Sequence, residues 1–413
     1  MKAEIITIGD ELLIGQVVDT NSAFIATELN KAGINVYQIT SVPDEKDRII
    51  IALDEAEKRA DLVLLTGGLG PTNDDITKYT LAGYFNSKLV RNEEVIANIK
   101  NILEKRDVRI NERNLKQADL PDNCEIIFNH FGSASGMWFI KDNIQFISMP
   151  GVPFEMKEML VNQIIPELIK RNKLPVIQHR TILTHGLAES VMAEKIRNWE
   201  SYLPSYIRLA YLPSPGILRL RLSGTSDNRD QLNKELNKQI DLLQKLLPEN
   251  IIGYNDDKLE EIIGQLLKKK HRTLSAAESC TGGTISQLIT SVPGASDYFK
   301  GSVVAYSNEI KQSVLNVSQE TLMNFGAVSQ QTVEEMAEGV RQLYQTDYAV
   351  AVSGIAGPGG GTPEKPVGTV WIAIASAKAT MSHLFHLGDN RGRNIQQATI
   401  AALNLLRKTI LQE

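Results

Sequence analysis

Three short apolar runs are the feature that most constrains the fold of this chain. They span Glu4–Ile8, Asp61–Leu65 and Gln145–Met149, and they are rich in Ile, Val and Leu. Each run leads into glycine, or into proline and then glycine, and each is followed by a polar turn and a helical pattern. Continuous apolar runs separated by helices are typical of a parallel sheet that is covered on both faces. The sequence therefore predicts an α/β domain over residues 1–170.

The middle of the chain has a different pattern. In Gly216–Ser223, Arg and Leu alternate, which indicates an antiparallel strand with one wet face. A charged helical segment follows from about Asn228 to Leu247 and stops at Pro248. We therefore expect a small α+β middle domain over residues 171–252.

The α/β alternation resumes in residues 253–413. The sequence predicts strands at Thr273–Ala277, Ser302–Tyr306, Tyr348–Ser353 and Val370–Ala375, and helices at Gln330–Tyr344 and Asn394–Leu411. The predicted fold class is thus α/β, with two three-layer α/β domains of mainly parallel sheets joined by the small α+β domain.

Composition limits the classes of function. The chain has 413 residues, 42% hydrophobic and 23% charged, which is typical of globular proteins with two or three cores. No apolar run reaches the ~18 residues of a membrane span, and the first residues show no basic leader. The two cysteines are far apart in sequence, so we expect a reducing cytoplasm and no disulfide framework. A formal net charge of −5 disfavours general attraction to nucleic acid.

Acidic residues and glycines follow the three apolar runs of the first domain. The carboxyl ends of parallel strands meet at one edge of a sheet, where such folds bind ligands. Gly67, Gly68 and Gly70 allow backbone N–H groups to approach an anion closely. Five carboxylates could hold a hard divalent ion there, namely Asp10, Glu11, Asp74, Asp75 and Glu155. The pattern favours cleavage of a phosphoanhydride, although the aspartates could merely cap a helix and the glycines merely turn the chain.

A serine stands at a predicted strand-to-helix turn in the last domain. Ser279 lies in Ala276-Ala-Glu-Ser-Cys-Thr-Gly-Gly, so the N–H groups of Cys280, Thr281 and Gly282 could form an oxyanion hole. A serine nucleophile needs a base, and no histidine is an obvious candidate, because the spacing of His383 and His386 sends them to opposite faces of a strand.

Two other groups remain open from the residues alone. Lys311 follows Tyr306 in Tyr-Ser-Asn-Glu-Ile-Lys and could be a base if burial lowered its pKa, but a lone lysine on a helix is usually a solvated charge. Cys280 is a rival nucleophile, or inert packing. The loop that begins at Ser353-Gly-Ile-Ala-Gly-Pro and the arginines Arg391 and Arg393 could hold a phosphate, or could be a connection and surface charges.

The motifs of the first domain resemble the molybdopterin-binding fold of molybdenum-cofactor biosynthesis enzymes. The resemblance rests on Gly9-Asp-Glu-Leu, on Thr66-Gly-Gly-Leu-Gly-Pro-Thr-x-Asp-Asp and on Met149-Pro-Gly-Val-Pro. In that family the glycine-rich segment and its aspartates hold a pterin phosphate or nucleotide with magnesium. The residues that the resemblance assigns to nucleotide binding are Gly9, Asp19, Asn21, Gly67, Gly68, Gly70, Thr72, Pro150 and Gly151.

The motifs of the last domain resemble the CinA family. They are Ala-Glu-Ser-Cys-Thr-Gly-Gly, Tyr-Ser-Asn-Glu-x-Lys, Gly326-Ala-Val-Ser, Ser-Gly-Ile-Ala-Gly-Pro and Lys365-Pro-Val-Gly-Thr-Val, and with the front and middle domains the similarity covers the whole chain. The family implies a nicotinamide-nucleotide amidase without a cofactor. Ser279 would attack the carboxamide of nicotinamide mononucleotide, Lys311 would activate the serine, and Tyr306 would support proton transfer. Gly354, Ala356, Gly357 and Arg391 would bind substrate. The family arginine usually follows Gly-Asp directly, whereas Asn390 intervenes here.

The same resemblance implies an ADP-ribose pyrophosphatase in the front domain, dependent on a divalent metal such as Mg, Mn or Co. The middle domain of the family is similar in topology to some RNA-binding modules. Between Asn172 and Ile252 no Gly-x-x-Gly clamp is present, which disfavours nucleic-acid binding and favours a spacer or a dimer contact. We expect a homodimer that binds small nucleotides and no membrane. The alternative is a scaffold in competence or DNA damage that binds a nucleotide or pterin without catalysis in one or both domains.

Overall fold

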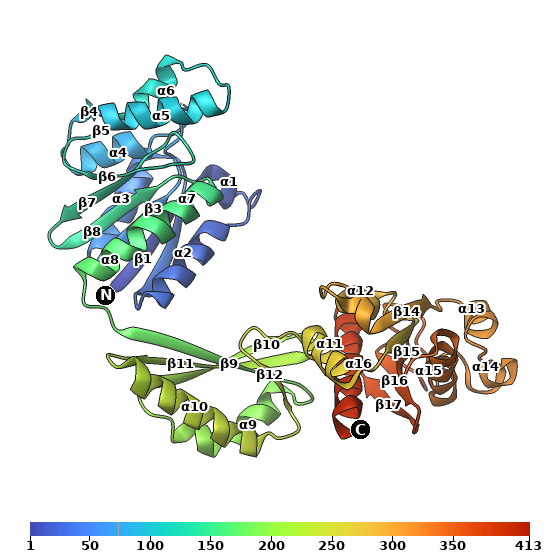
Figure 1. Cartoon of the computed structure of the whole chain (residues 1–413). Helices are drawn as coiled ribbons and strands as arrows, with labels where there is room; N and C mark the ends of the chain where they lie inside the picture. Colours follow the sequence, from blue (N-terminus) through green and yellow to red (C-terminus); the bar gives the residue numbers. More distant parts are fainter. Residues whose placement is uncertain (73) are drawn as a thin grey trace. The chain divides into compact units, whose positions relative to one another are not determined.

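The computed structural model describes residues 1–72 and 74–413. The chain divides into two compact units. The first, here called the front unit, comprises Met1–Gln178 with Thr225–Asn233, and the second, the rear unit, comprises His179–Gly224 with Lys234–Glu413. Figure 1 shows the elements of each unit by label and colour.

The front unit is built on one six-stranded sheet. Its strand order is β2 (Asn35–Val42), β1 (Lys2–Ile8), β3 (Leu62–Thr66), β8 (Ile144–Met149), β7 (Gly136–Lys141) and β6 (Glu125–Ile127). The first four strands are parallel, with Thr7 paired to Thr66 and Thr66 paired to Met149, so the ends of β1, β3 and β8 lie at one edge. This confirms the parallel core that the apolar runs predict. The last two strands are antiparallel, which the sequence did not predict.

Helices cover both faces of this sheet (Figure 1). Leu62 and Leu64 of β3 pack in a core with α2 (Thr20–Lys31), α7 (Pro153–Met159), the π-helical turn Leu160–Ile164 and α8 (Ile165–Arg171). Val63 and Leu65 of the same strand pack on the opposite face, in a core with α3 (Lys46–Glu57), α4 (Thr77–Tyr84) and α5 (Glu93–Lys105). Because successive strand residues point to opposite faces, a strand buried on both sides is mainly apolar, as β3 is from Leu62 to Leu65.

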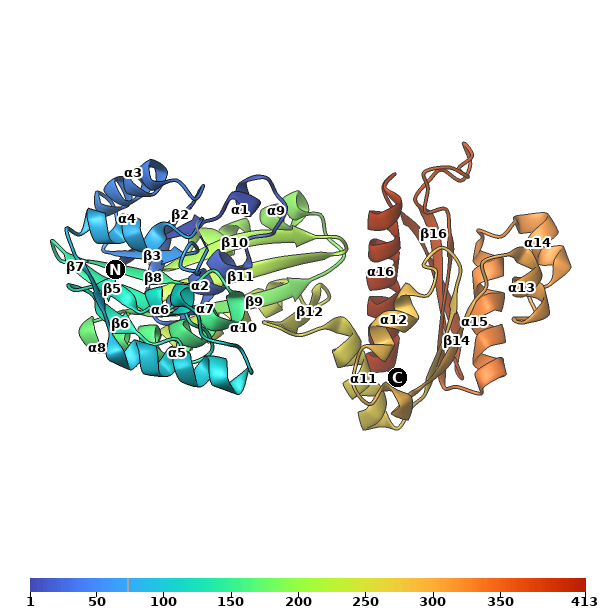
Figure 2. The same cartoon turned by 90° about the horizontal axis from the view of Figure 1, so that it is seen from above.

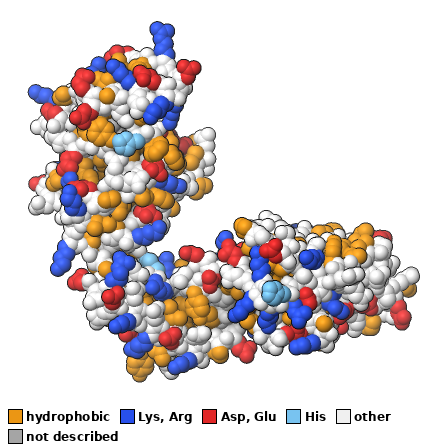
Figure 3. All heavy atoms as spheres, in the orientation of Figure 1, with side chains coloured by type: hydrophobic (Ala, Val, Ile, Leu, Met, Phe, Trp, Pro, Cys, Tyr) orange, Lys and Arg blue, Asp and Glu red, His pale blue; other side chains and the backbone are white. Residues whose placement is uncertain are grey.

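A small lobe follows α4. It holds a two-stranded antiparallel sheet of β4 (Leu89–Arg91) and β5 (Asp119–Pro121), together with α5 and the short α6 (Glu112–Lys116). Near it, Lys and Arg side chains are interspersed with Asp and Glu on the face of the front unit seen in Figure 3.

The middle segment forms a four-stranded sheet in the order β10 (Ile207–Ser214), β11 (Ile217–Ser226), β9 (Val176–Thr184) and β12 (Ile251–Tyr254). Two helices accompany it, α9 (Glu189–Ser201) and α10 (Arg229–Leu246). Leu218, Leu220 and Leu222 are buried while Arg221 is exposed, which confirms the predicted alternation along β11.

The last segment holds a five-stranded sheet in the order β14 (Phe299–Val304), β13 (Leu274–Glu278), β15 (Tyr348–Gly354), β16 (Thr369–Ser376) and β17 (Thr380–His386). Strand β13 is parallel to both of its neighbours, whereas β16 and β17 run antiparallel. The prediction of a strand reaching Tyr306 is wrong, because β14 ends at Val304 and Tyr306 lies in the loop beyond it.

Helices cover this sheet on both sides (Figure 2). On one side α11 (Leu259–Lys270), α12 (Thr284–Thr290) and α16 (Arg391–Gln412) pack on Val350 and Ile372. On the other, α15 (Gln330–Tyr344) packs on an alanine-rich face that includes Ala349 and Ala351. The remaining helices are α13 (Asn308–Ser313), α14 (Gln319–Phe325) and a 3-10 turn at Ala295–Asp297, and α1 (Asp10–Leu13) belongs to the front unit. In the part of the chain that the structure describes, no helix is long and apolar enough to cross a membrane.

Candidate active sites

Ser279 lies at the carboxyl end of β13, at the point where the strand order reverses between β14 and β15. Such switch points are where open α/β sheets bind ligands. The turn after β13 is held by the buried carboxylate of Glu278, which accepts the backbone N–H groups of Gly283, Ile285 and Ser286 at 3.0, 3.1 and 2.9 Å. The Ser279 N–H donates to Val352 O at 3.0 Å, and the side chain stays partly exposed. A fixed backbone thus presents the serine hydroxyl.

Lys311 reaches this serine from α13. Its Nζ donates to Ser279 Oγ at 3.2 Å and to the backbone oxygen of Ala305 at 2.7 Å, and the residue is only 1% exposed. Burial lowers the pKa of Lys311, because the charged ammonium is poorly solvated there, and this outweighs the opposing influence of Glu309. Among the described residues no carboxylate forms an ion pair with it. The geometry is that of a hydroxyl nucleophile beside an amine that can lose its proton.

Unused backbone donors lie next to Ser279. The N–H of Gly282 donates to Ser279 O at 3.1 Å, and the N–H of Gly283 is taken by Glu278. In the described part of the chain, no protein acceptor is recorded for the N–H groups of Cys280 and Thr281. The N–H of the residue after a nucleophilic serine is a common oxyanion-hole donor. Of the three residues predicted for this role, Cys280 and Thr281 retain a usable N–H group, whereas Gly282 does not.

Cys280 is unsuited to be the nucleophile. It is buried, and burial raises the pKa of its thiol to about 12. Since the thiolate is the reactive form, a thiol with this pKa is almost entirely protonated at neutral pH. The structure therefore favours the serine over the cysteine.

In the described part of the chain, Tyr306 forms no hydrogen bond with Ser279 or Lys311. Its hydroxyl accepts a hydrogen bond from Arg391 Nη2 at 3.0 Å, and the side chain is 62% exposed. Arg391 Nη1 donates to the backbone oxygen of Gly357 at 2.8 Å, so one guanidinium joins Tyr306 to the glycine-rich loop after β15. Figure 2 shows α16, which Arg391 opens. The structure thus brings three predicted residues together although 85 positions separate the tyrosine from the arginine.

Asn394 is a residue that sequence reasoning missed. It is 1% exposed, and its Nδ2 donates to Ala356 O at 3.0 Å and to Gly388 O at 2.8 Å. It therefore ties the predicted substrate loop at Ala356 to the segment before Arg391. Four residues separate Gly388-Asp389 from Asn394 at the start of a predicted helix, but an asparagine there suggests a cap or a surface residue. Only the fold shows its reach.

The front unit has a pocket of about 420 Å³ at the carboxyl ends of β1, β3 and β8. We call it the front pocket, and its lining includes Gly9, Glu11, Gly67, Gly68, Gly70, Asp74, Asp75, Pro150, Gly151 and Glu155. The three strand ends that the sequence predicts to converge do meet there. At Gly67, where φ is +119°, a Cβ atom would stand 2.1 Å from Ile8 O, so the close approach of β1 and the loop requires glycine.

Other predicted residues have structural roles beside this pocket. Asp19 caps α2 by accepting the Ser22 N–H at 2.9 Å. Asn21 Nδ2 donates to Gly151 O at 2.8 Å, and its buried Oδ1 has no hydrogen-bond partner among the residues that the structure describes. Both residues line a neighbouring pocket of about 120 Å³ that also contains Glu11.

The two aspartates after the glycines do not cap a helix, because α4 begins only at Thr77 and its N-cap residue is Ile76. Asp75 instead accepts the backbone N–H groups of Gly70 and Thr72 at 2.7 and 2.8 Å, and also the Thr72 hydroxyl. Asp74 is exposed, and a hydrogen bond from the Thr72 side chain lowers its pKa. Asn73, between Thr72 and Asp74 in sequence, lies outside the described residues.

Asp44 is a second residue that the sequence analysis missed. It follows β2, lines the front pocket, and burial raises the pKa of its carboxyl, with further increases from Asp10, Glu11 and Asp75. The sequence held a signal for this residue, because Val42-Pro-Asp44 marks a fourth strand end that carries an acidic side chain. Asp10, Glu11 and Asp75 are therefore each close enough to Asp44 to disfavour its charged form.

The chemistry of these carboxylates suits a hard divalent cation, because such a cation prefers oxygen ligands. These carboxylates are not assembled around one point, however. Glu155 accepts a hydrogen bond from Asn129 Nδ2 at 2.7 Å, and among the residues described no three His, Cys, Asp or Glu side chains converge as metal ligands. Asp10, Glu11, Asp44 and Asp75 are the residues that would hold a cation.

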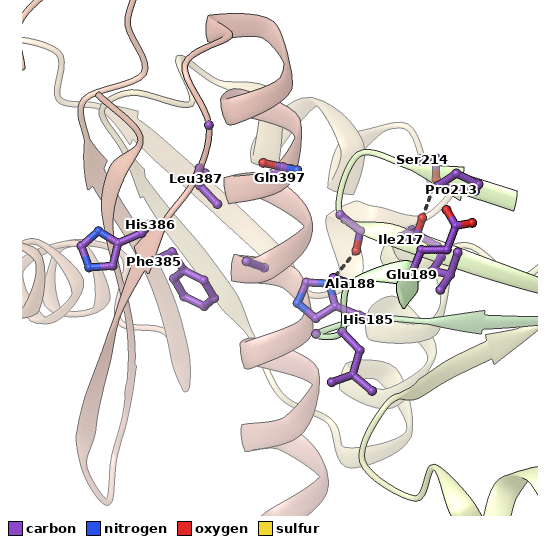
Figure 4. Close-up of a pocket in the computed structure, with 16 residues that line it drawn as sticks. His185, Ala188, Glu189, Pro213, Ser214, Ile217, Phe385, His386, Leu387 and Gln397 are labelled. Atoms are coloured by element: carbon purple, nitrogen blue, oxygen red, sulfur yellow. Dashed lines mark hydrogen bonds between the residues drawn. The ribbon is translucent and has the colours of Figure 1, made fainter. Parts of the chain in front are cut away.

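A larger pocket of about 510 Å³ lies in the rear unit (Figure 4). His185 stands on one side and Phe385 and Gln397 on the other. The His185 Nδ1 is 2.6 Å from Gly216 O. Neither Ser279 nor Lys311 lines this pocket, and its wall is mainly apolar, so it does not bear on the proposed chemistry.

Fold and site together define an α/β protein with a serine beside a buried lysine in its last domain and a glycine-rich, acidic pocket in its first. Three family models match it in the same order: "Probable molybdopterin binding domain" over residues 4–170, "Damage-inducible protein CinA KH domain" over 179–253 and "CinA C-terminal domain" over 256–410. The chain belongs to the CinA family.

Full-length relatives support this assignment. The chain is similar to a CinA-like protein of Flavobacterium psychrophilum, 48% identical with 100% of this chain and 99% of the relative covered. It is also similar to a CinA-like protein of Cytophaga hutchinsonii, 48% identical with 99% and 98% covered. A crystal structure of competence/damage inducible protein CihA from Agrobacterium tumefaciens is 38% identical, with a TM-score of 0.35, and the match covers 36% of this chain and 94% of that one.

Proposed function

We propose that the rear site is a serine amidohydrolase that converts nicotinamide mononucleotide to nicotinate mononucleotide and ammonia, without a cofactor. The observation that carries the proposal is the 3.2 Å contact between Lys311 Nζ and Ser279 Oγ, made by an amine that is 1% exposed and whose pKa is lowered by burial. Membership of the CinA family supports the choice of substrate.

The residues present can carry out each step. The neutral Lys311 amine takes the hydroxyl proton while Ser279 Oγ bonds to the carboxamide carbon. The carbonyl oxygen gains negative charge and can accept hydrogen bonds that the free N–H groups of Cys280 and Thr281 donate. Lys311 returns the proton to the amide nitrogen, the C–N bond breaks and ammonia leaves. Water, deprotonated by the same amine, then adds to the ester and releases the carboxylate and the serine.

Recognition of a mononucleotide requires a cation for its phosphate. Arg391 is exposed and already fixed by Gly357 and Tyr306, so its guanidinium is held in place with little freedom left to lose. A fixed guanidinium binds phosphate oxygens with strong charge-assisted hydrogen bonds. We assign Arg391 to the phosphate and Tyr306 to positioning that arginine.

The test is ammonia release from nicotinamide mononucleotide. Ser279→Ala should lose activity by roughly a thousandfold or more, whereas Ser313→Ala, which removes an exposed hydroxyl from the same helix as Lys311, should match the wild type. Full activity in the Ser279→Ala chain would refute the serine mechanism.

The front pocket favours a second function, metal-dependent hydrolysis of ADP-ribose to AMP and ribose 5-phosphate. The supporting observation is that Glu11, Asp44 and Asp75 line one pocket with the Gly67–Gly70 loop, and that Asp10, Glu11 and Asp75 raise the pKa of Asp44, whose burial raises it most. A bound divalent ion of the Mg, Mn or Co type would supply charge neutralisation for the pyrophosphate and polarise an attacking water. The carboxylates would hold this ion and orient the water, and the loop N–H groups would contact phosphate oxygens.

The alternative for the front unit is a scaffold that binds a nucleotide or pterin without turning it over. A pyrophosphatase should lose activity in chelator and regain it when metal is added, whereas a scaffold should bind ADP-ribose and leave it intact across several metals. We further propose that the protein is a cytoplasmic homodimer that binds small nucleotides and neither nucleic acid nor membranes. Sedimentation and a nucleic-acid binding assay test the assembly and the partner.

A further inference from the structure

A second pocket adjoins the front pocket on the side of the small lobe. It has a volume of about 330 Å³, and three cations line it, Lys78 of α4 together with Arg113 and Lys116 of α6. We call it the basic pocket. Tyr79, Gln117 and part of the glycine-rich loop also line it.

The three cations of the basic pocket have no carboxylate partner among the described residues. The two nearby acids of the lobe, Glu112 and Asp119, both pair with Arg91, at 3.7 and 2.8 Å. Lys78 is the most enclosed, since its Nζ donates to Lys116 O at 2.7 Å and lies 5.4 Å from the centre of the Tyr79 ring. Burial lowers the pKa of Lys78 to about 8, against a small opposing effect of Asp119. Asp75 also lines the basic pocket, but its carboxylate accepts hydrogen bonds from Gly70 and Thr72, so the three cations remain available to an anion.

Gln117 connects the two pockets. It is 4% exposed, lines both of them, and donates through Nε2 to Leu69 O at 3.1 Å. Among the described residues its buried Oε1 has no hydrogen-bond partner, although a buried amide oxygen normally accepts a hydrogen bond. Gly70 and Asp75 also line both pockets. An acidic compartment that suits a cation and a basic compartment that suits an anion therefore share one wall.

We propose that the basic pocket binds the phosphate that leaves when a pyrophosphate is hydrolysed in the front pocket. The inference rests on the proposed pyrophosphatase function and adds a leaving-group site to it. A water oxygen bonds to one phosphorus, the bond from that phosphorus to the bridging oxygen breaks, and the bridging oxygen keeps the electron pair on the second phosphate. The two protons of the water leave to solvent or to the product phosphates. The second phosphate becomes a phosphomonoester with a charge near −2, which Lys78, Arg113 and Lys116 neutralise.

Gln117 fits the same ligand. Its unpartnered Oε1 can accept a hydrogen bond from a hydroxyl or amine of the leaving nucleotide or sugar. The substrate class is thus a pyrophosphate diester with a hydroxyl- or amine-bearing group on the phosphate that lies in the basic pocket.

The experiment measures the affinity of the full chain for AMP in the presence of chelator, by titration calorimetry. It is done in an Arg391→Ala background, so that the phosphate position proposed for the rear site does not contribute. We expect Lys116→Met to weaken AMP binding about tenfold and Lys78→Met at least as much, the loss typical of a charge-assisted hydrogen bond. Lys105→Met, an exposed cation at the end of α5 in the same lobe, is the matched control and should change the affinity less than twofold.

The outcomes separate this inference from the proposed activity. Equal affinities in all chains, or an equal loss in the Lys105→Met control, would overturn the phosphate site. If AMP binding falls as expected but the wild type leaves ADP-ribose intact, the pyrophosphatase proposal fails and the phosphate site stands. Because Lys78 is half-buried, Lys116→Met decides the result if the Lys78→Met chain does not fold, as judged by its thermal unfolding.

Discussion

Replacing Lys311 by methionine separates catalysis from folding at the rear site. Methionine fills nearly the same volume without charge or proton, so the amine is lost while the packing of α13 is kept. Removing a general base costs about 10²–10⁴-fold in rate, or roughly 3–5 kcal/mol of transition-state stabilisation. We therefore expect ammonia release from nicotinamide mononucleotide to fall by at least about a hundredfold.

The free energy of unfolding should change much less. Ala305 O loses the donor that now lies 2.7 Å away, which costs about 1–3 kcal/mol for a buried carbonyl. The penalty of burying an ammonium is removed at the same time, and it acts in the opposite direction. We expect a net change within about 2 kcal/mol, measured by urea unfolding at neutral pH.

The pH dependence gives the sign of the charge effect. The pKa of Lys311 in the folded chain lies below the ordinary lysine value of 10.5, so the unfolded chain binds more protons between these two values. Wild-type stability should therefore rise relative to Lys311→Met as pH increases through that window. Activity should rise over the same range, as the amine loses its proton, with an apparent pKa below 10.5.

Two further variants complete the test. Lys311→Arg keeps a positive charge but cannot lose it, so it should be as inactive as the methionine variant. Lys269→Met, at an exposed position on α11, should behave as the wild type. The reasoning is refuted if Lys311→Arg retains wild-type activity, because the lysine would then act only as a fixed charge.

Three other predictions follow from single contacts. Cys280→Ala should keep its ammonia-release activity within a few-fold, since the thiol is protonated; a loss as deep as that of Ser279→Ala would restore the cysteine as nucleophile. Glu278→Gln should lower the free energy of unfolding by about 2 kcal/mol or more, because its carboxylate accepts three backbone N–H groups and a hydroxyl, and urea titration measures this. Asp44→Asn should raise the metal concentration for half-maximal ADP-ribose hydrolysis by about tenfold or more, and an unchanged metal titration would argue against a cation among these carboxylates.

The sequence predicted much of the frame of both sites. The apolar runs gave β1, β3 and β8, and the glycines after them marked where the chain must approach β1 closely, as Gly67 does. The expected strand before Ser279 and the expected helix at Gln330–Tyr344 both exist. These features depend on residues that are neighbours in sequence, and local periodicity reports them directly.

The boundary at Tyr306 was predicted wrongly for a physical reason. Ser302–Tyr306 has strand-like residues throughout, but β14 is an edge strand that follows β13 only as far as its partner extends. The pairing ends at Glu278 and Val304, and Ala305 and Tyr306 lie beyond it. The carbonyl oxygen of Ala305 then accepts a hydrogen bond from Lys311, and the hydroxyl of Tyr306 accepts one from Arg391.

By itself the sequence determined that this chain has strand ends rich in glycine and acidic residues, and a serine at a strand-to-helix turn. Backbone freedom and hydrophobic periodicity depend on residues that are consecutive in sequence, so the sequence reports them directly. Only the tertiary structure decided that Lys311 is buried, that it lies 3.2 Å from a serine 32 positions away, and that Asp44 joins the other acids. Burial and charge proximity arise from packing between distant segments, and the pKa values on which the proposed chemistry depends follow from that packing.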